Sequence, residues 1–278
     1  MRYDLAGRVV AITGSTGGLG RAVAVALKVR GARLALFDLD ADAVAAQVKS
    51  LGTSSDVWGT HIDVRSWETT EKAIDAAATH FGGLDVIIAI AGIAISSPME
   101  KLAPEAFDRV IDINLNGVWR TFRAALPHVR QRQGYMLAIS SMAAFVHSPL
   151  QAQYTASKAG IWAMCDSVRL EVRRLGVGVG TIHPTFFATA MMDEVLADPA
   201  GVKIWGGNSK GLWKMVPLQA VVDGVIRGIE RRKDLIVIPS KNGLVARAPG
   251  LFRRSIERVG FNDRDIEAAI AAAGDGRR

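Results

Sequence analysis

A tyrosine and a lysine stand four residues apart in the segment Tyr154-Thr155-Ala156-Ser157-Lys158. In a helix this spacing places both side chains on one face. A phenol has a pKa of about 10, so at neutral pH it accepts a proton poorly unless its phenolate is stabilised. Lowering that pKa by about three units takes about 4 kcal/mol, which an ammonium ~4 Å away supplies at an effective dielectric of ~20 but not in bulk water. In a cleft with little water, Lys158 could therefore make Tyr154 a general acid or base.

A glycine-rich segment with the sequence TGSTGGLG occupies residues 13–20, between a first β-like run and a first helical pattern. Its glycines permit a tight turn and close approach of the backbone to a pyrophosphate, and the helix N-terminus offers free N–H groups. Such a loop is weak evidence alone, but its place between strand and helix predicts a dinucleotide cradle. It lacks the Gly-Lys-Ser/Thr ending of a nucleoside triphosphate loop. The candidate contacts are Gly14, Thr16, Gly18, Leu19 and Gly20.

Asp38 ends the second apolar run, 18 residues after the last glycine of this loop. A carboxylate there can accept both hydroxyls of an adenosine ribose and would repel a 2′-phosphate. Neither Lys nor Arg lies at position 39 or at 15–17 to receive that phosphate. The sequence therefore predicts NAD rather than NADP, the alternative for Asp38 being a solvated loop acid. Asp63, after the third run, could reach an adenine edge, although alone it is only a helix N-cap candidate.

Short β-branched runs alternate with longer helical patterns along the whole chain. Strands are expected at 9–12, 34–37, 57–62, 86–88, 136–139, 177–182 and 235–238, and helices at 21–30, 41–50, 67–81, 107–133 and 152–175. Strands that are apolar on both faces and alternate with helices predict a parallel sheet covered on both sides. The expected fold class is α/β, a Rossmann-type doubly wound parallel sheet with helices on both faces. We expect one domain over residues 1–278, with a substrate-loop insertion at about 190–215 and a basic C-terminal extension at about 240–278.

Composition excludes several classes of protein. With 278 residues, 49% hydrophobic and 22% charged, the chain can bury a sizeable core and is not disordered. Cys165 is the sole cysteine, so it cannot form an intrachain disulfide, and a reducing compartment is the default. The longest apolar run, Val86–Ile95, is about half as long as a membrane span, and the N-terminus has no signal-peptide hydrophobic region. We expect a soluble cytoplasmic protein.

The net charge of +7 is concentrated near the C-terminus. Residues 227–278 hold 12 Lys and Arg against 7 Asp and Glu, whereas residues 1–226 hold 22 against 20. Without a zinc-finger spacing or an aromatic RNA-binding motif, a solvated basic face is favoured over a nucleic-acid site. Residues 243–259 would also suit a basic amphipathic helix on a membrane surface. Pro249-Gly250 interrupts that pattern, so packing on the chain's own domain or on a neighbouring subunit is preferred.

Together these features resemble the short-chain dehydrogenase/reductase family over nearly the whole chain. Ser141 stands 13 residues before Tyr154, and the segment 184–189 (PTFFAT) is similar to the family's Pro-Gly-x-Val-x-Thr stretch. The resemblance implies a homotetramer or homodimer built on the long helices. It implies a catalytic tetrad of Asn114, Ser141, Tyr154 and Lys158. It also implies cofactor contacts at Asp63, Val64, Ala91, Gly92, Tyr154, Lys158, Pro184, Phe187 and Thr189.

Four positions depart from the family pattern. Residues 89–92 read AIAG where the family has Asn-Asn-Ala-Gly, and the missing asparagines usually support the central sheet. Thr185 replaces a glycine and Phe187 a smaller valine, which would narrow the nicotinamide end. All four positions of the tetrad are retained.

The resemblance implies an NAD-dependent oxidoreductase that interconverts a hydrophobic secondary alcohol and its ketone by hydride transfer. In it Tyr154 is the general acid/base, Lys158 also bonds the nicotinamide ribose, Ser141 holds the substrate oxygen, and Asn114 orders a water for proton relay. The alternative is a catalytically silent NAD-binding regulatory or scaffold protein. The retained Ser, Tyr and Lys argue against it.

Several apolar side chains fall near segments that would border the cleft, which favours a cyclic, terpenoid, steroid-like or acyl substrate. The alternative is that about half of these side chains pack in the core or in a subunit contact. For His147 the alternative is a solvated loop histidine. The candidates are Phe145, His147, Phe186, Met192 and Trp205, with Met99, Met191 and Trp213 beside them. No metal is expected, because His61, His80, His128 and His183 share no ligand spacing with acids or with Cys165, which is interpreted as core filler.

Overall fold

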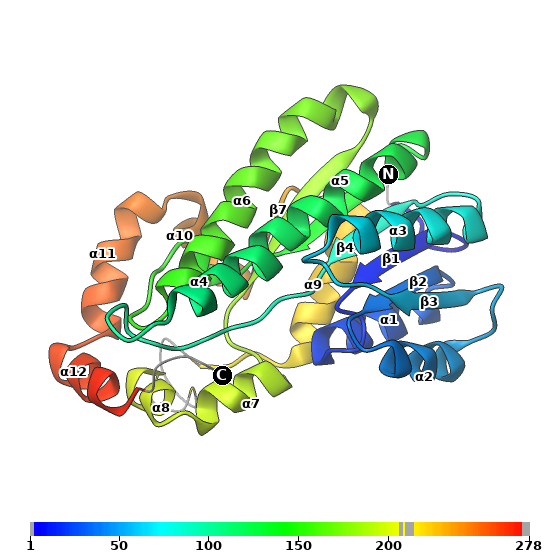
Figure 1. Ribbon diagram of the computed structural model, residues 1–278. Coiled ribbons are helices and arrows are strands. Elements are labelled where there is room, and N and C mark those ends of the chain that lie inside the picture. Colours follow the sequence, from blue (N-terminus) through cyan, green and yellow to red (C-terminus); the bar gives the residue numbers. More distant parts are fainter. Residues whose placement is uncertain (1–2, 206–207, 209–213, 274–278) are drawn as a thin grey trace.

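Seven parallel strands form the centre of the computed structural model, which describes residues 3–205, 208 and 214–273 (Figure 1). The order β3-β2-β1-β4-β5-β6-β7 places β1 between β2 and β4, where the direction of winding reverses. This topology confirms the doubly wound parallel sheet. The strands are β1 (Val9–Thr13), β2 (Arg33–Asp38), β3 (Val57–His61), β4 (Val86–Ala89), β5 (Tyr135–Ile139), β6 (Gly178–Pro184) and β7 (Leu235–Ile238).

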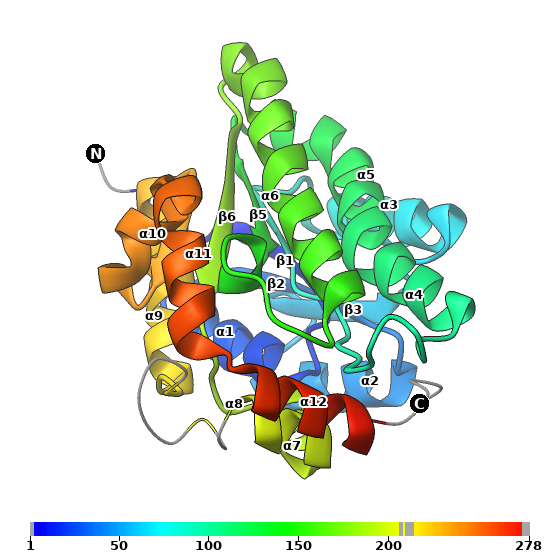
Figure 2. The same cartoon turned by 90° about the vertical axis from the view of Figure 1, so that its left-hand side faces the viewer.

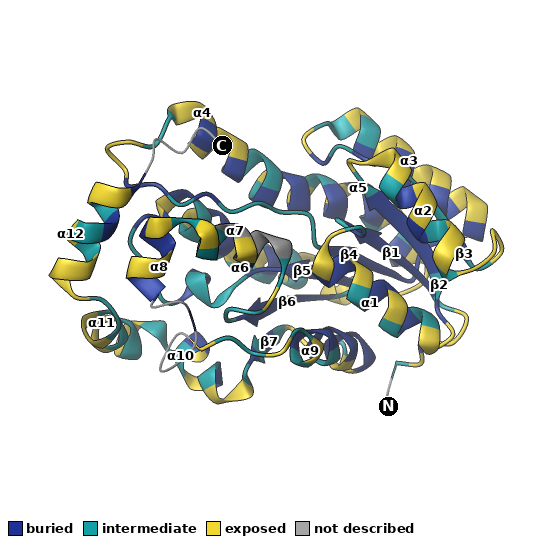
Figure 3. Cartoon of the chain, turned by 90° about the horizontal axis from the view of Figure 1, so that it is seen from below, coloured by how far each residue is buried: buried dark blue, intermediate teal, exposed yellow. Residues whose placement is uncertain are grey.

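Helices cover both faces of the sheet. On one face α1 (Gly18–Val29), α2 (Ala41–Leu51) and α9 (Leu218–Arg231) enclose one apolar cluster. On the other, α3 (Trp67–Phe81), α5 (Gly117–Gln131) and α6 (Ala152–Val172) enclose a second. The central strands β1, β4 and β5 are buried throughout, as Figure 3 shows, because both of their faces meet helices. α9 falls outside the expected elements.

The long helix expected at 107–133 is interrupted in the structure. It begins earlier, as α4 (Pro104–Ile111), where proline suits a first helical turn. A π-helical turn, Asp112–Asn116, then joins α4 to α5. Because a π turn carries an extra residue, it changes which side chains face inward, and Asn114 is fully buried.

The expected substrate-loop insertion is helical over its first half. α7 (Ala190–Ala197) and α8 (Pro199–Trp205) follow β6, and the segment is closed at its base by a bridge between Phe187 and Val216. Three further helices form the C-terminal extension: α10 (Gly243–Arg247), α11 (Pro249–Gly260) and α12 (Asp263–Ala272).

The extension packs on the rest of the chain, with α12 against α8 (Figure 2). Leu150, Trp205 and Ala269 share one buried cluster there. The Nζ of Lys101 donates to the carbonyl of Ile270 at 2.8 Å, near the end of α12. Among the described helices, none is both long and apolar enough to cross a membrane.

Candidate active site

A cleft of about 830 Å³ opens at the carboxyl end of the sheet. It lies over the switch point between β1 and β4, where doubly wound folds bind their ligands. All of the predicted dinucleotide contacts line this cleft, as do three members of the predicted tetrad, Ser141, Tyr154 and Lys158. Residues at or just after the ends of six strands contribute to its wall, namely Gly14, Asp38, Ile62, Ile90, Ile139 and Pro184.

The glycine-rich loop has the geometry of a phosphate cradle. Gly14 has a φ of +69°, and a Cβ there would lie 2.6 Å from the backbone nitrogen of Ala91. A Cβ on Gly20 would lie 2.1 Å from the carbonyl oxygen of Gly14. Gly17 caps α1 without a side-chain hydrogen bond, and the first turn has no acidic residue. The N–H groups of this turn therefore face the cleft without a competing carboxylate, which fits a dinucleotide pyrophosphate.

Asp38 is held at the rim of the cleft by its neighbours. Its Oδ2 accepts hydrogen bonds from the backbone N–H of Thr16 at 2.9 Å and from the Thr16 hydroxyl at 2.7 Å. Its Oδ1 accepts from the N–H of Leu39 at 2.8 Å. The buried side chain of Gln47 donates to the carbonyl of Ser15 at 2.9 Å and braces the same loop. A carboxylate fixed in this way fits the two hydroxyls of a ribose.

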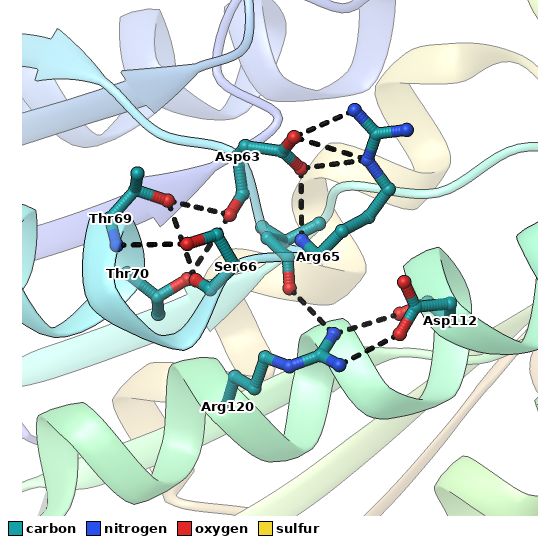
Figure 4. A network of polar contacts seen from close by, with 8 residues as sticks. Asp63, Arg65, Ser66, Thr69, Thr70, Asp112 and Arg120 are labelled. Carbon is teal, nitrogen blue, oxygen red and sulfur yellow. Dashed lines mark hydrogen bonds and ion pairs between the residues drawn. The ribbon is translucent and has the colours of Figure 1, made fainter.

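Asp63 has a partner that the sequence motifs do not indicate (Figure 4). The Arg65 guanidinium contacts its carboxylate at 2.7 Å, and the backbone N–H of Arg65 donates to it at 2.9 Å. These contacts hold the pKa of Asp63 below its ordinary value. Arg120 braces the turn from α5 by donating to the carbonyl of Val64 at 3.0 Å and to Asp112 at 2.8 Å. The contact between Asp63 and an adenine stays a prediction. In that contact the Asp63 carboxylate would bind both the adenine and Arg65.

Tyr154 and Lys158 lie one turn apart in α6, with Ser141 opposite them after the end of β5. The Ser141 hydroxyl hydrogen-bonds to the Tyr154 phenol. The Lys158 Nζ lies 5.4 Å from the centre of the Tyr154 ring and donates to the carbonyl of Ile139 at 2.9 Å. The Ser140 hydroxyl donates to the backbone oxygen of Lys158 at 2.9 Å, so the end of β5 and α6 are tied together.

Burial governs the protonation of both side chains. It raises the pKa of Tyr154 above its ordinary value, and the hydrogen bond from Ser141 opposes this rise. Burial also lowers the pKa of Lys158 to about 8. A lowering of the Tyr154 pKa by Lys158 stays a prediction for the protein with its dinucleotide bound. Lys158 still carries most of its charge at neutral pH.

Asn114 lies behind the cleft wall and not in it. Its Oδ1 accepts from the N–H of Ile93 at 2.8 Å, and its Nδ2 donates to the Ile93 carbonyl at 2.9 Å. Its Nδ2 also lies 3.1 Å from the hydroxyl of Ser157. The side chain thus ties the cleft-lining segment after β4 to the tyrosine helix. Ordering of a water by Asn114 stays a prediction.

Apolar side chains form the far end of the cleft. Phe186, Met192 and Trp205 line it, as expected, and the rings of Phe186 and Trp205 lie 5.6 Å apart. Met99 is 88% exposed and does not line the cleft. The side chain of Met191, and all of Trp213, lie outside the described part of the chain.

Phe145 and His147 do not line the cleft, contrary to expectation. A short 3₁₀ turn, Met142–Ala144, directs Phe145 into the core, where its ring packs 4.9 Å from Trp162 and 4.6 Å from His183. The backbone N–H of His147 faces α11 and lies 3.4 Å from the Glu257 carboxylate. The loop after Ser141 therefore turns away from the cleft at both residues.

His183 is the residue near the site that sequence reasoning missed. It lies on β6, fully buried, with its Nδ1 3.1 Å from the carbonyl oxygen of Ser141. The available signal is its place at the carboxyl end of a strand, immediately before Pro184. That signal alone does not reveal which neighbour it contacts.

Comparison with known proteins settles the family. Residues 8–200 match the model of the short chain dehydrogenase family, which is more than half of the chain. The chain belongs to the short-chain dehydrogenase family. This is a family of oxidoreductases that use NAD or NADP, generally oligomeric and acting on small molecules.

Curated relatives differ widely in substrate. The chain is 34% identical over 206 residues to 3beta-hydroxysteroid dehydrogenase 1 of Eggerthella lenta, covering 72% of this chain and 78% of that one. It is 31% identical over 218 residues to D-threitol dehydrogenase of Mycolicibacterium smegmatis, covering 77% and 80%. The fold is similar to that of a short chain dehydrogenase/reductase from Burkholderia phymatum solved in complex with NAD. That pair has a TM-score of 0.79 and 22% identity, covering 94% of this chain and 97% of the other.

Proposed function

We propose that this short-chain dehydrogenase is an NAD-dependent enzyme that interconverts a hydrophobic secondary alcohol and its ketone. The observation that carries the proposal is the convergence of Ser141, Tyr154 and Lys158 in the cleft that also holds the glycine cradle. A catalytically silent scaffold would have no need of the hydrogen bond between Ser141 and Tyr154.

Each residue of this group has a proposed role in the reaction. A bound nicotinamide dinucleotide supplies or accepts the hydride. The Ser141 hydroxyl holds the substrate oxygen, and the Tyr154 phenol gives or takes the proton at that oxygen. The Lys158 ammonium bonds the nicotinamide ribose and stabilises the phenolate, which is needed because burial raises the pKa of Tyr154. Asn114 holds the backbone at Ile93 next to α6 through its hydrogen bonds to Ile93 and to Ser157.

NAD is the proposed cofactor because of the charge at the ribose end. The Asp38 carboxylate, fixed by Thr16 and Leu39, would accept ribose hydroxyls and repel a 2′-phosphate. Gly14 and Gly20 leave room for the pyrophosphate against the backbone. Thr189, whose side chain lies 3.6 Å from a Cβ built on Gly18, is the proposed contact of the nicotinamide carboxamide.

The substrate is proposed to be hydrophobic because the far wall of the cleft is aromatic and aliphatic. Phe186 and Trp205 form a continuous aromatic surface, and Met192 adds an adaptable side chain. The name of the 3beta-hydroxysteroid relative gives a hydrophobic substrate, whereas the name of the D-threitol relative gives a polar one. A flat cyclic alcohol is therefore preferred to a sugar alcohol.

A homodimer or homotetramer is proposed, formed through the long helices α5 and α6. Trp119 on α5 and Leu170 on α6 are 52% and 53% exposed, and such an assembly would cover them. A cytoplasmic location is proposed because Cys165 is a buried free thiol.

An activity screen tests the proposed function directly. Purified protein is mixed with NAD or NADP and a panel of cyclic, steroid-like and acyclic secondary alcohols and of sugar alcohols. The matching ketones are tested with NADH or NADPH, and nicotinamide absorbance is followed in both directions. We expect turnover of hydrophobic alcohols with NAD. Tight NAD binding without turnover of any alcohol or ketone would instead support the silent scaffold.

A further inference from the structure

A neutral histidine is buried directly behind the proposed catalytic serine. His183 is fully buried on β6, with its ring 4.6 Å from the ring of Phe145. Its two ring nitrogens both have polar neighbours: Nδ1 lies 3.1 Å from the Ser141 carbonyl oxygen, and Nε2 lies 2.8 Å from the Thr181 hydroxyl. A buried imidazole with both nitrogens engaged is an ordered group whose proton position can be worked out.

The proton lies on Nδ1. The carbonyl oxygen of Ser141 can only accept, so the nitrogen facing it must donate. Burial and the charge of the nearby Lys158 both lower the pKa of His183, to about 4, so the ring is neutral and Nε2 is an acceptor. The Thr181 hydroxyl then donates to Nε2, since its other contact, to the Asp234 carbonyl, is 3.5 Å long.

His183 hydrogen-bonds to Ser141, the residue whose hydroxyl contacts Tyr154. The Ser141 carbonyl also accepts from the N–H of Ala144 at 3.1 Å, and the Ser141 hydroxyl accepts from the N–H of Ala143 at 3.1 Å. These two local bonds belong to the 3₁₀ turn and would move with it. His183 is anchored on the neighbouring strand, so its bond fixes the turn relative to the sheet.

We propose that His183 is a positioning residue, which holds Ser141 in place through its carbonyl so that the serine hydroxyl points at the Tyr154 phenol and the substrate oxygen. The role rests on the proposed function, because it matters only if Ser141 and Tyr154 handle the substrate. His183 does not touch substrate or dinucleotide, since it is fully buried and lies outside the cleft wall. His183 thus adds a buried positioning residue on β6 to the proposed site.

Three variants separate positioning from simple core packing. His183→Leu removes the donor, whereas His183→Asn keeps an N–H donor near the position of Nδ1. Thr181→Val removes a buried polar group of the same cluster but leaves Nδ1–H facing Ser141. Since a displacement of about 1 Å in a catalytic group can cost about 10²-fold in rate, we expect His183→Leu to lower kcat by about 10- to 100-fold. We expect His183→Asn and Thr181→Val to stay within about threefold of wild type, and NAD affinity to be unchanged throughout.

A double-mutant cycle asks whether His183 acts through Ser141. In a Ser141→Ala background the serine hydroxyl is already gone, so His183→Leu should cause no further loss of kcat. A full additional loss in that background would overturn the proposal, as would a folded His183→Leu protein with kcat within threefold of wild type. Equal losses in the Leu and Asn variants would also contradict it, because the donor would then be irrelevant.

A measurement on the unmodified protein covers the case in which the leucine variant does not fold. Nitrogen-15 chemical shifts of the histidine ring report the tautomer, and we expect His183 to be protonated on Nδ1 at neutral pH. Protonation on Nε2 would overturn the proposal. This measurement needs no substrate, so failure of the wild-type enzyme to oxidise any alcohol would count against the proposed function and leave the hydrogen bond to be judged separately.

Discussion

Lys158 carries its ammonium inside the protein, where burial lowers its pKa from 10.5 to about 8. Such a group is a cost to folding, because the unfolded chain holds the proton more tightly than the folded one. The cost is fully present below pH about 8 and fades as the pH rises towards about 10.5. The proposed role of Lys158 in catalysis gives a reason for an amine at this position despite its cost to stability.

A neutral replacement of Lys158 makes this cost measurable. We expect Lys158→Met to raise the free energy of unfolding at neutral pH by about 1–3 kcal/mol and to abolish turnover. Urea unfolding at a series of pH values measures the effect, and the advantage of the variant should shrink above pH about 8. A Met variant less stable than wild type at neutral pH would contradict the assignment. It would mean that the hydrogen bond to Ile139 stabilises the fold by more than burial of the ammonium destabilises it.

Asp38 is the residue proposed to decide between NAD and NADP. It should contribute one or two charge-assisted hydrogen bonds to the ribose, each worth about 1.5–3 kcal/mol. We therefore expect wild type to prefer NAD, and Asp38→Ala to lower kcat/KM for NAD by at least about tenfold. The same change should raise kcat/KM for NADP, because the carboxylate no longer repels the 2′-phosphate.

Asp40→Ala is the matched control for Asp38, because it removes a neighbouring carboxylate that caps α2 and does not line the cleft. Its ratio of kcat/KM for the two dinucleotides should equal that of wild type. A wild-type preference for NADP would contradict the assignment.

Single residues also mark the limit of what sequence predicts. Residues 154 and 158 share a helix face, so their proximity follows from spacing. His183 lies 42 residues from Ser141, and their contact follows only from the pairing of β5 with β6. Phe145 is close to Ser141 in sequence, yet a 3₁₀ turn buries it. The distance between two residues in sequence predicts their distance in space along a helix, but not across a turn.

Among the elements, the glycine-rich loop at residues 13–20 owes its fold to close contact between backbone segments. A Cβ on Gly20 would meet the Gly14 carbonyl at 2.1 Å, whereas one on Gly17 would meet the same oxygen at 3.6 Å. We expect Gly20→Ala to lower the free energy of unfolding by about 2–4 kcal/mol, and Gly17→Ala to change it by less than about 1 kcal/mol.

Chemical denaturation of the two glycine variants gives the comparison. Unfolding is the proper readout, since Gly17 lines the cleft and its methyl group could also touch a dinucleotide. Equal destabilisation by the two substitutions would contradict the close approach of Gly20 to Gly14.

Elements follow from the sequence where periodicity is unbroken. The apolar runs that became β1, β2 and β4 and the helix Trp67–Phe81 were predictable because their burial is regular. The π turn at Asp112–Asn116 was not, since its flanking helices keep helical spacing on both sides. Helix α8, in the expected substrate-loop insertion, packs on α12, which is distant in sequence. The local sequence pattern therefore could not predict its structure.

At the scale of the whole molecule, the proposed assembly involves the exposed face of α5 and α6. Trp119 is 52% exposed there and contacts Trp67 of α3 at its rim. A charge at this site would be buried in the assembly, so we expect Trp119→Glu to dissociate the oligomer.

Sedimentation velocity measures the mass of each variant. Val29→Glu is the control, because Val29 is 79% exposed on α1, which covers the opposite face of the sheet from the two long helices. It should leave the assembly intact. A monomeric wild type, or dissociation by Val29→Glu alone, would contradict the assembly proposed for the long helices.

The central claim is that Tyr154 moves the substrate proton in a cleft that holds the dinucleotide independently. Tyr154→Phe removes only the phenol oxygen, which Ser141 contacts. The decisive measurement is NAD affinity by titration together with alcohol turnover by nicotinamide absorbance, on wild type and Tyr154→Phe. We predict an NAD dissociation constant within a few-fold of wild type and turnover reduced by at least about 10²-fold. A phenylalanine variant that retains appreciable turnover would contradict this role for Tyr154.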